Sequence, residues 1–125
     1  MSFTIQTIQN EQIRSSVTQF TGAQFSLTHN GSVAEFELSV LVQSSTNDFF
    51  ANKIACTATR TSAGVVAVLN PTNIIITGVG SGGFAAMSDA QTIFDANLTD
   101  IRLRITPTSA VTSNWLVHGT VKLYY

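Results

Sequence analysis

The chain has 125 residues and a formal net charge of −1, which suits one domain whose core buries about two-thirds of its unfolded surface. Charged residues make up only 10% of it, against about 25% in typical soluble domains, and Thr and Ser together supply 30 of the 125 positions. The slightly negative net charge argues against a nucleic acid or an anionic membrane as an electrostatic partner.

The weakly charged, hydroxyl-rich composition has two interpretations. Thr is a good strand former, so an all-β protein accumulates it. Alternatively, a surface with few ions suits permanent packing against other protein, because buried charges are costly there. Both interpretations stay open at this point.

Cys56 is the single cysteine, so the chain can form neither an intramolecular disulfide nor a multi-thiolate metal site. Its alternation with Ile54 and Ala58 predicts a buried, inert thiol. The first residues lack a basic region followed by an apolar one, so we expect no signal peptide. The apolar runs are too short to span a bilayer, and we expect a protein made in a cytoplasm, with no membrane partner.

The start of the chain predicts a short strand and then an ambiguous segment. Phe3 and Ile5 alternate with polar residues, as in an opening strand. Asn10–Thr21 is polar, with Ile13, Val17 and Phe20 at helix-like spacing. We interpret it as a connection, or as an arm that packs on a neighbouring subunit; an edge strand would look similar.

A hairpin is predicted around Asn30-Gly31, a dipeptide typical of two-residue β-turns. Gln24–Thr28 precedes it, and the strand that follows begins at Val33. That second strand alternates strictly between an apolar and a polar face. Its apolar face holds Phe36, Leu38, Val40 and Val42, and its polar face holds Glu35, Glu37, Ser39 and Gln43.

Two further strands are predicted in Lys53–Thr61 and Val65–Leu69, joined by a turn at Ser62–Gly64 as a second hairpin. Phe49 and Phe50 lead into the first of them after the polar loop Ser44–Asp48. Asn70–Asn73 contains Pro71, which ends the run. The β-branched block Ile74–Thr77 then predicts a buried strand.

The glycine-rich stretch that follows matches a nucleotide-binding spacing only superficially. Gly78, Gly80 and Gly83 satisfy G-x-G-x-x-G, yet no long helix or βαβ unit surrounds them. We therefore expect a loop tip or tight crossover. Ser88 and Gln91 match a helix-capping pattern, so one or two helical turns are predicted over Asp89–Ala96.

The end of the chain, Asp100–Tyr125, predicts a closing hairpin. Ile101, Leu103 and Ile105 share one face, opposite Arg102 and Arg104. After the connection Pro107–Asn114, a second run on one face begins with Trp115, a predicted core anchor. This run consists of Trp115, Val117, Gly119, Val121, Leu123 and Tyr125.

Together these elements predict one all-β domain over residues 1–125, an antiparallel β-sandwich or jelly roll. It would have about eight strands and at most one short helix, with residues 10–21 as an arm or connection.

Residues suited to chemistry are too dispersed to predict an activity. His29 falls in a turn, His118 on an outer face, and neither lies in a nucleophile or metal motif. Glu35 and Glu37 are more simply explained as solvated side chains than as a catalytic pair. We expect no enzyme, no catalytic residues, no metal and no cofactor.

The charged outer faces provide the candidate interaction face. Two acidic and two basic outer positions would complement each other, within the sheet or across a subunit contact. This face consists of Arg102, Arg104, His118, Lys122, Glu35 and Glu37.

The C-terminal sequence T-S-N-W-L-V-H-G-T-V-K-L-Y-Y, preceded by D-I-R-L-R-I-T, resembles the closing hairpin of small virion proteins of tailed bacteriophages. The short length, the many Thr, Ser and Asn residues and the scarcity of cysteine fit the same group. The resemblance implies a β-sandwich or jelly-roll subunit of the virion, often a homotrimer, whose partners are the major capsid or tail proteins. It supplies no catalytic residues.

The leading hypothesis is therefore a capsid decoration or cement protein that stabilises the shell by protein–protein contacts. The alternative is a carbohydrate- or receptor-binding module of a tail fibre or spike, because sugar sites combine exposed aromatic rings with amides. Its candidate residues are Phe49, Phe50, Asn52 and Asn114.

Overall fold

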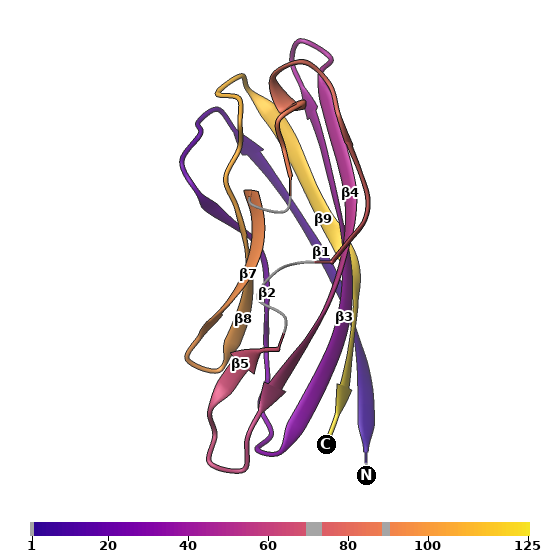
Figure 1. Cartoon of the computed structure of the whole chain (residues 1–125), viewed down its shortest axis with the longest axis vertical. Coiled ribbons are helices and arrows are strands. Elements are labelled where there is room, and N and C mark those ends of the chain that lie inside the picture. The colour runs from indigo at the N-terminus through magenta and orange to yellow at the C-terminus, as the bar shows by residue number, and fades with distance from the viewer. Residues whose placement is uncertain (1, 70–73, 89–90) are drawn as a thin grey trace.

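The computed structural model describes residues 2–69, 74–88 and 91–125. In these ranges nine strands form two antiparallel sheets that face each other, as Figure 1 shows. The strands are β1 (Phe3–Arg14), β2 (Phe20–Ser26), β3 (Ser32–Ser44), β4 (Phe49–Arg60), β5 (Val66–Val68), β6 (Ile74–Gly80), β7 (Thr92–Asn97), β8 (Asp100–Ile105) and β9 (Ser113–Tyr124). The described ranges also contain a 3₁₀ turn, η1 (Gly82–Phe84), and Gln91 is in 3₁₀ conformation as well. The predicted all-β antiparallel sandwich is thus confirmed.

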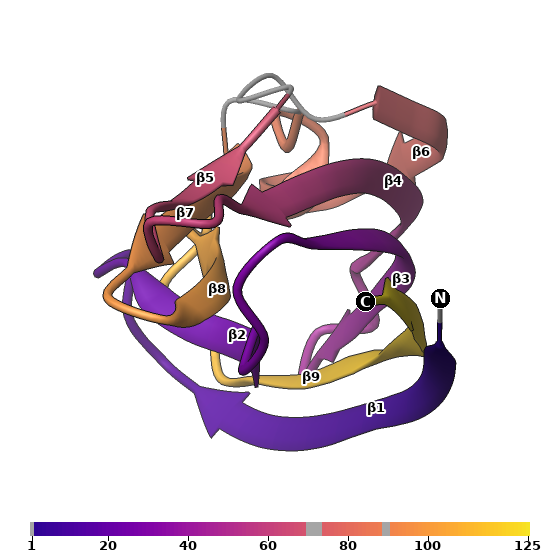
Figure 2. The ribbon, with the colours of Figure 1, turned by 90° about the horizontal axis from the view of Figure 1, so that it is seen from below.

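The larger sheet has six strands and the smaller sheet has three. In the larger one, the order is β1-β9-β3-β4, and the far edge of β4 is shared by β5 at one end and β6 at the other. In the smaller one, the order is β2-β8-β7, with a bulge in β2 between Thr21 and Ala23. Figure 2 shows how the larger sheet curves around the smaller one.

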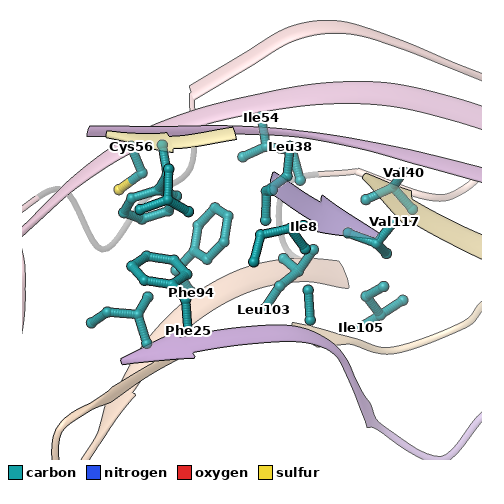
Figure 3. Close-up of a cluster of buried hydrophobic side chains, with 14 of the residues drawn as sticks. Ile8, Phe25, Leu38, Val40, Ile54, Cys56, Phe94, Leu103, Ile105 and Val117 are labelled. Atoms are coloured by element: carbon teal, nitrogen blue, oxygen red, sulfur yellow. The ribbon is translucent and has the colours of Figure 1, made fainter. Parts of the chain in front are cut away.

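The core lies between the sheets and takes the apolar residues of every alternating strand. Figure 3 shows side chains from both sheets meeting there, among them Leu38 and Val117 from the larger sheet and Leu103 from the smaller. Trp115 is buried, with its ring edge-on to those of Phe20 and Phe84 at 5.5 and 5.6 Å. Its predicted role as a core anchor is confirmed.

The predicted closing hairpin is wrong, although both of its strands form. β8 pairs with β2 and β7, whereas β9 pairs with β1 and β3 in the other sheet. The two strands therefore bury their apolar faces against each other across the core instead of sharing a hydrogen-bonded edge.

The predicted hairpin at Asn30-Gly31 is wrong for the same reason. The turn is there, with Gly31 at a φ of 72° and its N–H donating to the carbonyl of Thr61 at 3.2 Å. It connects β2 in the smaller sheet to β3 in the larger one. The predicted hairpin of β4 with β5 forms. β3 and β4 also pair as a hairpin, which the sequence did not predict.

The N-terminal segment is a long strand and not a short one followed by an arm. β1 continues to Arg14 and pairs with β9 along its whole length. The predicted arm 10–21 therefore holds the end of β1, a connection at 15–19 and the start of β2. The side-chain amides of Asn10 and Gln12 donate to the carbonyls of Gly22 and Thr21 at 2.6 and 2.8 Å. These bonds close the sandwich between β1 and β2.

Of the helical turns predicted at 89–96, Gln91 is in 3₁₀ conformation, but the prediction is wrong from Thr92 onward, because Thr92–Asn97 is β7. The capping contact nevertheless forms, since the side-chain oxygen of Gln91 accepts from the N–H of Ser88 at 2.9 Å. The burial of Thr92 and Phe94 in the sandwich outweighs this local signal. Residues 89–90 lie outside the described ranges, as does the predicted break at 70–73.

Of the glycine-rich stretch, Gly78 and Gly80 lie in β6, and Gly83 lies in η1. The stretch that we expected to be a loop tip or tight crossover therefore begins within β6, which pairs with β4.

Candidate functional site

The outer face of the larger sheet is the surface that faces away from the smaller sheet. Antiparallel register aligns its side chains into rows that cross β1, β9, β3 and β4. One such row is Gln9, His118, Ser39 and Lys53, and another is Ile13, Asn114, Gln43 and Phe49. Side chains distant in sequence are thus neighbours across this face.

The middle of the outer face is polar and weakly charged. Lys53 and Glu37 form an ion pair at 2.5 Å, with both side chains about half exposed. Such an exposed pair contributes little to stability, about 0–1 kcal/mol. Glu35 stands opposite Lys122 in the register of β3 with β9.

One end of the outer face is apolar and hollowed into a groove. Ile13, Leu41 and Phe49 are 74%, 41% and 44% exposed, and they line a groove of about 650 Å³. Leu116 and Ala51 lie beside Leu41 in the same row. Single exposed apolar residues are ordinary, whereas a group of them on one sheet face is a candidate contact surface. We call this set, Ile13, Leu41, Phe49, Ala51 and Leu116, the apolar groove.

The opposite end of the outer face is apolar as well. Phe3 and Ile5 of β1 are 66% and 61% exposed. The ring of Phe3 lies 6.3 Å from that of Tyr124, which is the neighbour of Val33 on β3. The outer face therefore carries an apolar group at each end and a polar centre.

The structure divides the six predicted interaction residues between two opposite surfaces. Glu35, Glu37, His118 and Lys122 lie on the outer face of the larger sheet, and Arg102 and Arg104 lie on the far side of the smaller one. The acidic pair therefore does not meet Arg102 and Arg104 within this chain.

Both arginines have partners of their own in the smaller sheet or beside it. Arg102 donates to both carboxylate oxygens of Asp95 at 2.9 and 3.0 Å. This hydrogen-bonded pairing with Asp95 raises the pKa of Arg102. Arg104 donates to the side-chain oxygen of Gln19 at 3.2 Å.

The four residues proposed for sugar binding are likewise separated. Phe49 and Asn114 line the apolar groove, next to the amide of Gln43. Phe50 and Asn52 are buried in the core. Adjacent residues of a strand point to opposite faces, so a consecutive Phe-Phe pair cannot place both rings on one surface.

The remaining candidates for chemistry are structural. Cys56 is buried as predicted, and His29 stacks on the ring of Tyr125 at a centroid distance of 3.9 Å. Within the described ranges, no group of three or more His, Cys, Asp and Glu residues is placed to hold a metal ion. In the same ranges, no helix has the length and apolarity needed to cross a membrane.

Sequence reasoning missed the apolar groove, although a signal for it exists. Leu41 and Leu116 are large apolar residues at positions whose strand neighbours of the same parity are polar. Ile13 is a third such residue, because β1 continues to Arg14 and therefore includes it. Each of these three neighbouring strands has an apolar residue at a position where the alternation predicts a polar, outward-facing one. Taken together, the three residues would have indicated this surface.

Comparisons with known proteins show a similarity of fold. No protein-family model matches the chain, and no curated protein matches it. Among solved structures, it is similar to the tailspike protein of the Acinetobacter phage vB_ApiP_P1, with a TM-score of 0.52 and 14% sequence identity. The match covers 90% of this chain and 22% of the tailspike. The chain therefore spans about a fifth of the tailspike's length, and at this identity the likeness concerns the fold.

Proposed function

We propose that this protein is a structural component of a phage virion, located in a tail appendage, and that it acts through protein–protein contacts. The observation that carries the proposal is the fold likeness to a phage tailspike over 90% of the chain. The resemblance of the C-terminal sequence to small virion proteins points to the same class, although β8 and β9 do not pair as the hairpin in which it was recognised. Of the two locations that this resemblance implied, the tailspike likeness favours the tail over a capsid-decorating role.

The outer face of the larger sheet supports a contact role. A face that only meets water gains nothing from exposed Ile13, Leu41 and Phe49, whereas a contact face buries them. Its few charges lower the desolvation penalty of such a contact. The partner that fits is another virion protein with an apolar, weakly charged surface.

The proposed role is not enzymatic. The outer face offers hydroxyl, amide and apolar groups, which suit packing and hydrogen bonding. No step of the proposed role requires a nucleophile, a general base or a metal.

A second candidate function is glycan binding in the apolar groove. The observation that favours it is the exposed ring of Phe49 beside the amides of Gln43 and Asn114. Such a ring can stack on a sugar face while the amides bind its hydroxyl groups. This function would also fit a tail appendage.

The test is incorporation of a groove variant into virions. Leu41→Glu places a charge in the apolar groove, and Gln24→Glu, on the outer side of the smaller sheet, is the matched control. We expect labelled antibodies to locate the wild-type protein on the tail. We expect Leu41→Glu to fold, as judged by circular dichroism, and yet to be lost from purified particles, while Gln24→Glu is retained.

Absence of the wild-type protein from virions would overturn the proposal, as would normal incorporation of Leu41→Glu. Labelling of the capsid would overturn the tail location and support decoration. If Phe49→Ala were incorporated normally but lost binding to host-surface oligosaccharides, the glycan function would be favoured.

A further inference from the structure

The larger sheet ends in a long open edge, formed by β1. Figure 2 shows β1 as the outermost strand of this sheet. It pairs with β9 on one side through all twelve residues, and no strand of the described ranges pairs with its other side. The backbone groups on that side are thus available to another strand.

The ladder with β9 identifies which groups face outward. Ser2 and Tyr125 exchange both of their backbone hydrogen bonds. In an antiparallel ladder such pairs recur at every second residue, so the even-numbered residues of β1 bond to β9. The odd-numbered ones point their N–H and C=O groups outward. These residues are Phe3, Ile5, Thr7, Gln9, Glu11 and Ile13.

The edge also lacks most of the usual protection against pairing, and its charged residues, Glu11 and Arg14, lie near one end of the strand. Natural edge strands are kept short, bulged, or interrupted by proline or lysine. β1 contains no proline, glycine or lysine, and its register with β9 runs without a bulge. Among the other edges, β5 has three residues, β2 carries a bulge and β6 pairs with β4 in an irregular register. β7 is regular but has half the length of β1. An edge of this length with so little protection is one that a partner strand covers.

We propose that the partner is a second copy of this chain, and that the two β1 strands pair antiparallel around a two-fold axis at Ile8. In this register Phe3 bonds to Ile13 of the second copy, Ile5 to Glu11 and Thr7 to Gln9. All six outward-facing residues are then paired. A shift by two residues in either direction leaves an outward-facing residue of each copy unpaired, and a shift by one brings inward-bonded residues opposite outward ones.

The side chains fit the same register. Phe3 and Ile13 belong to the apolar groups at opposite ends of the outer face. The two-fold axis places Phe3 of one copy beside Ile13 of the other. The apolar groove of one copy therefore continues into Phe3 and Tyr124 of the second copy. The dimer thus extends the larger sheets into one continuous sheet. This pairing makes dimers, in contrast to the homotrimer that the phage resemblance implies, and it is independent of the proposed function.

The first test is the mass of the protein in solution. We expect light scattering to give twice the chain mass of 13.4 kDa. Thr7→Pro removes an outward N–H and leaves the ladder with β9 intact, because the N–H of Thr7 does not point to β9. We expect Thr7→Pro to be a folded monomer, and Thr7→Val, which keeps the N–H, to remain a dimer.

Cross-linking tests the register without a proline in the strand. In a Cys56→Ala background, we expect Ile8→Cys to form a disulfide between copies, because it faces itself across the axis. We expect Gln6→Cys alone not to cross-link, and a mixture of Gln6→Cys with Asn10→Cys to do so. A monomeric or trimeric wild-type protein would overturn the proposal. So would a dimeric Thr7→Pro variant, or cross-linking of Gln6→Cys alone in place of Ile8→Cys.

Discussion

Asn52 is a polar side chain in an apolar environment. It lies on the inner face of β4 and is 4% exposed. Among the described residues, neither its amide nitrogen nor its amide oxygen has a hydrogen-bond partner. A buried polar group left without a partner costs about 1–3 kcal/mol.

We therefore expect Asn52→Leu to stabilise the protein, raising the free energy of unfolding by about 1–2 kcal/mol. Urea denaturation followed by tryptophan fluorescence measures this change, since Trp115 lies in the same core. Asn114→Leu is the control, because Asn114 is exposed and should change stability little. A destabilised Asn52→Leu variant would show that Asn52 binds a buried water that the leucine displaces.

For single residues, the sequence predicts well which side chains are buried. The alternation of Ile54, Cys56 and Ala58 places all three in the core, and the same parity places Asn52 there too. The interpretation of Asn52 as a sugar ligand ignored this parity. Leu41 and Leu116 were missed for a related reason, since apolar residues at an outward position were not considered as a group.

β9 is an interior strand of the larger sheet, between β1 and β3. It pairs with β1 on one side and with β3 on the other. Leu123 stands between Thr4 of β1 and Ala34 of β3. Loss of its last residues would therefore leave the start of β1 without a partner and β3 paired on one side only, with β4.

We expect deletion of Leu123–Tyr125 to abolish soluble folding. The deletion removes pairing from both neighbours of β9 and uncovers core residues such as Ala34. Solubility on expression and the melting temperature of any soluble product measure the effect. Deletion of Tyr125 alone, which removes the bonds to Ser2 and the stacking on His29, should leave a folded protein. An unchanged melting temperature after the longer deletion would contradict this prediction.

At the scale of elements, alternation predicted most strands but not their partners. A period of two shows which side chains share a face, and it contains no information on which strand lies alongside. Hence β8 and β9 were both predicted, but as a hairpin, although they belong to different sheets. The Ser88–Gln91 contact forms as the capping motif predicted, yet the chain passes from Gln91 directly into β7.

For the molecule as a whole, the composition and the candidate site agree. Only 10% of the residues are charged, and the apolar groove contains none of them. An association through β1 and this surface would rely on backbone hydrogen bonds and apolar burial. Salt screens ion pairs but has little effect on either of these.

We therefore expect the dimer dissociation constant to change less than about threefold between about 0.1 and 1 M NaCl, where the Debye length falls from about 10 Å to about 3 Å. Sedimentation at several protein concentrations in each salt measures it. A dissociation constant that rises steeply with salt would contradict this prediction, because it would show that ion pairs hold the copies together.

The candidate site was only partly predictable because it depends on the arrangement of the sheets. Glu35, Glu37, His118 and Lys122 share the outer face that their parity indicated. Arg102 and Arg104 were grouped with them through the hairpin that does not form, and the sandwich places them on its other side.

The adjacent ends of the chain determine how the domain responds to force. Ser2 and Tyr125 bond to each other at one end of the molecule, where Figure 1 places both termini. Tension applied through the two ends would break the hydrogen-bonded pairs of β1 with β9 one after another, starting at the termini. Force that enters through the outer face is instead distributed over many bonds at once. The fold thus resists traction on its surfaces far better than traction on its termini.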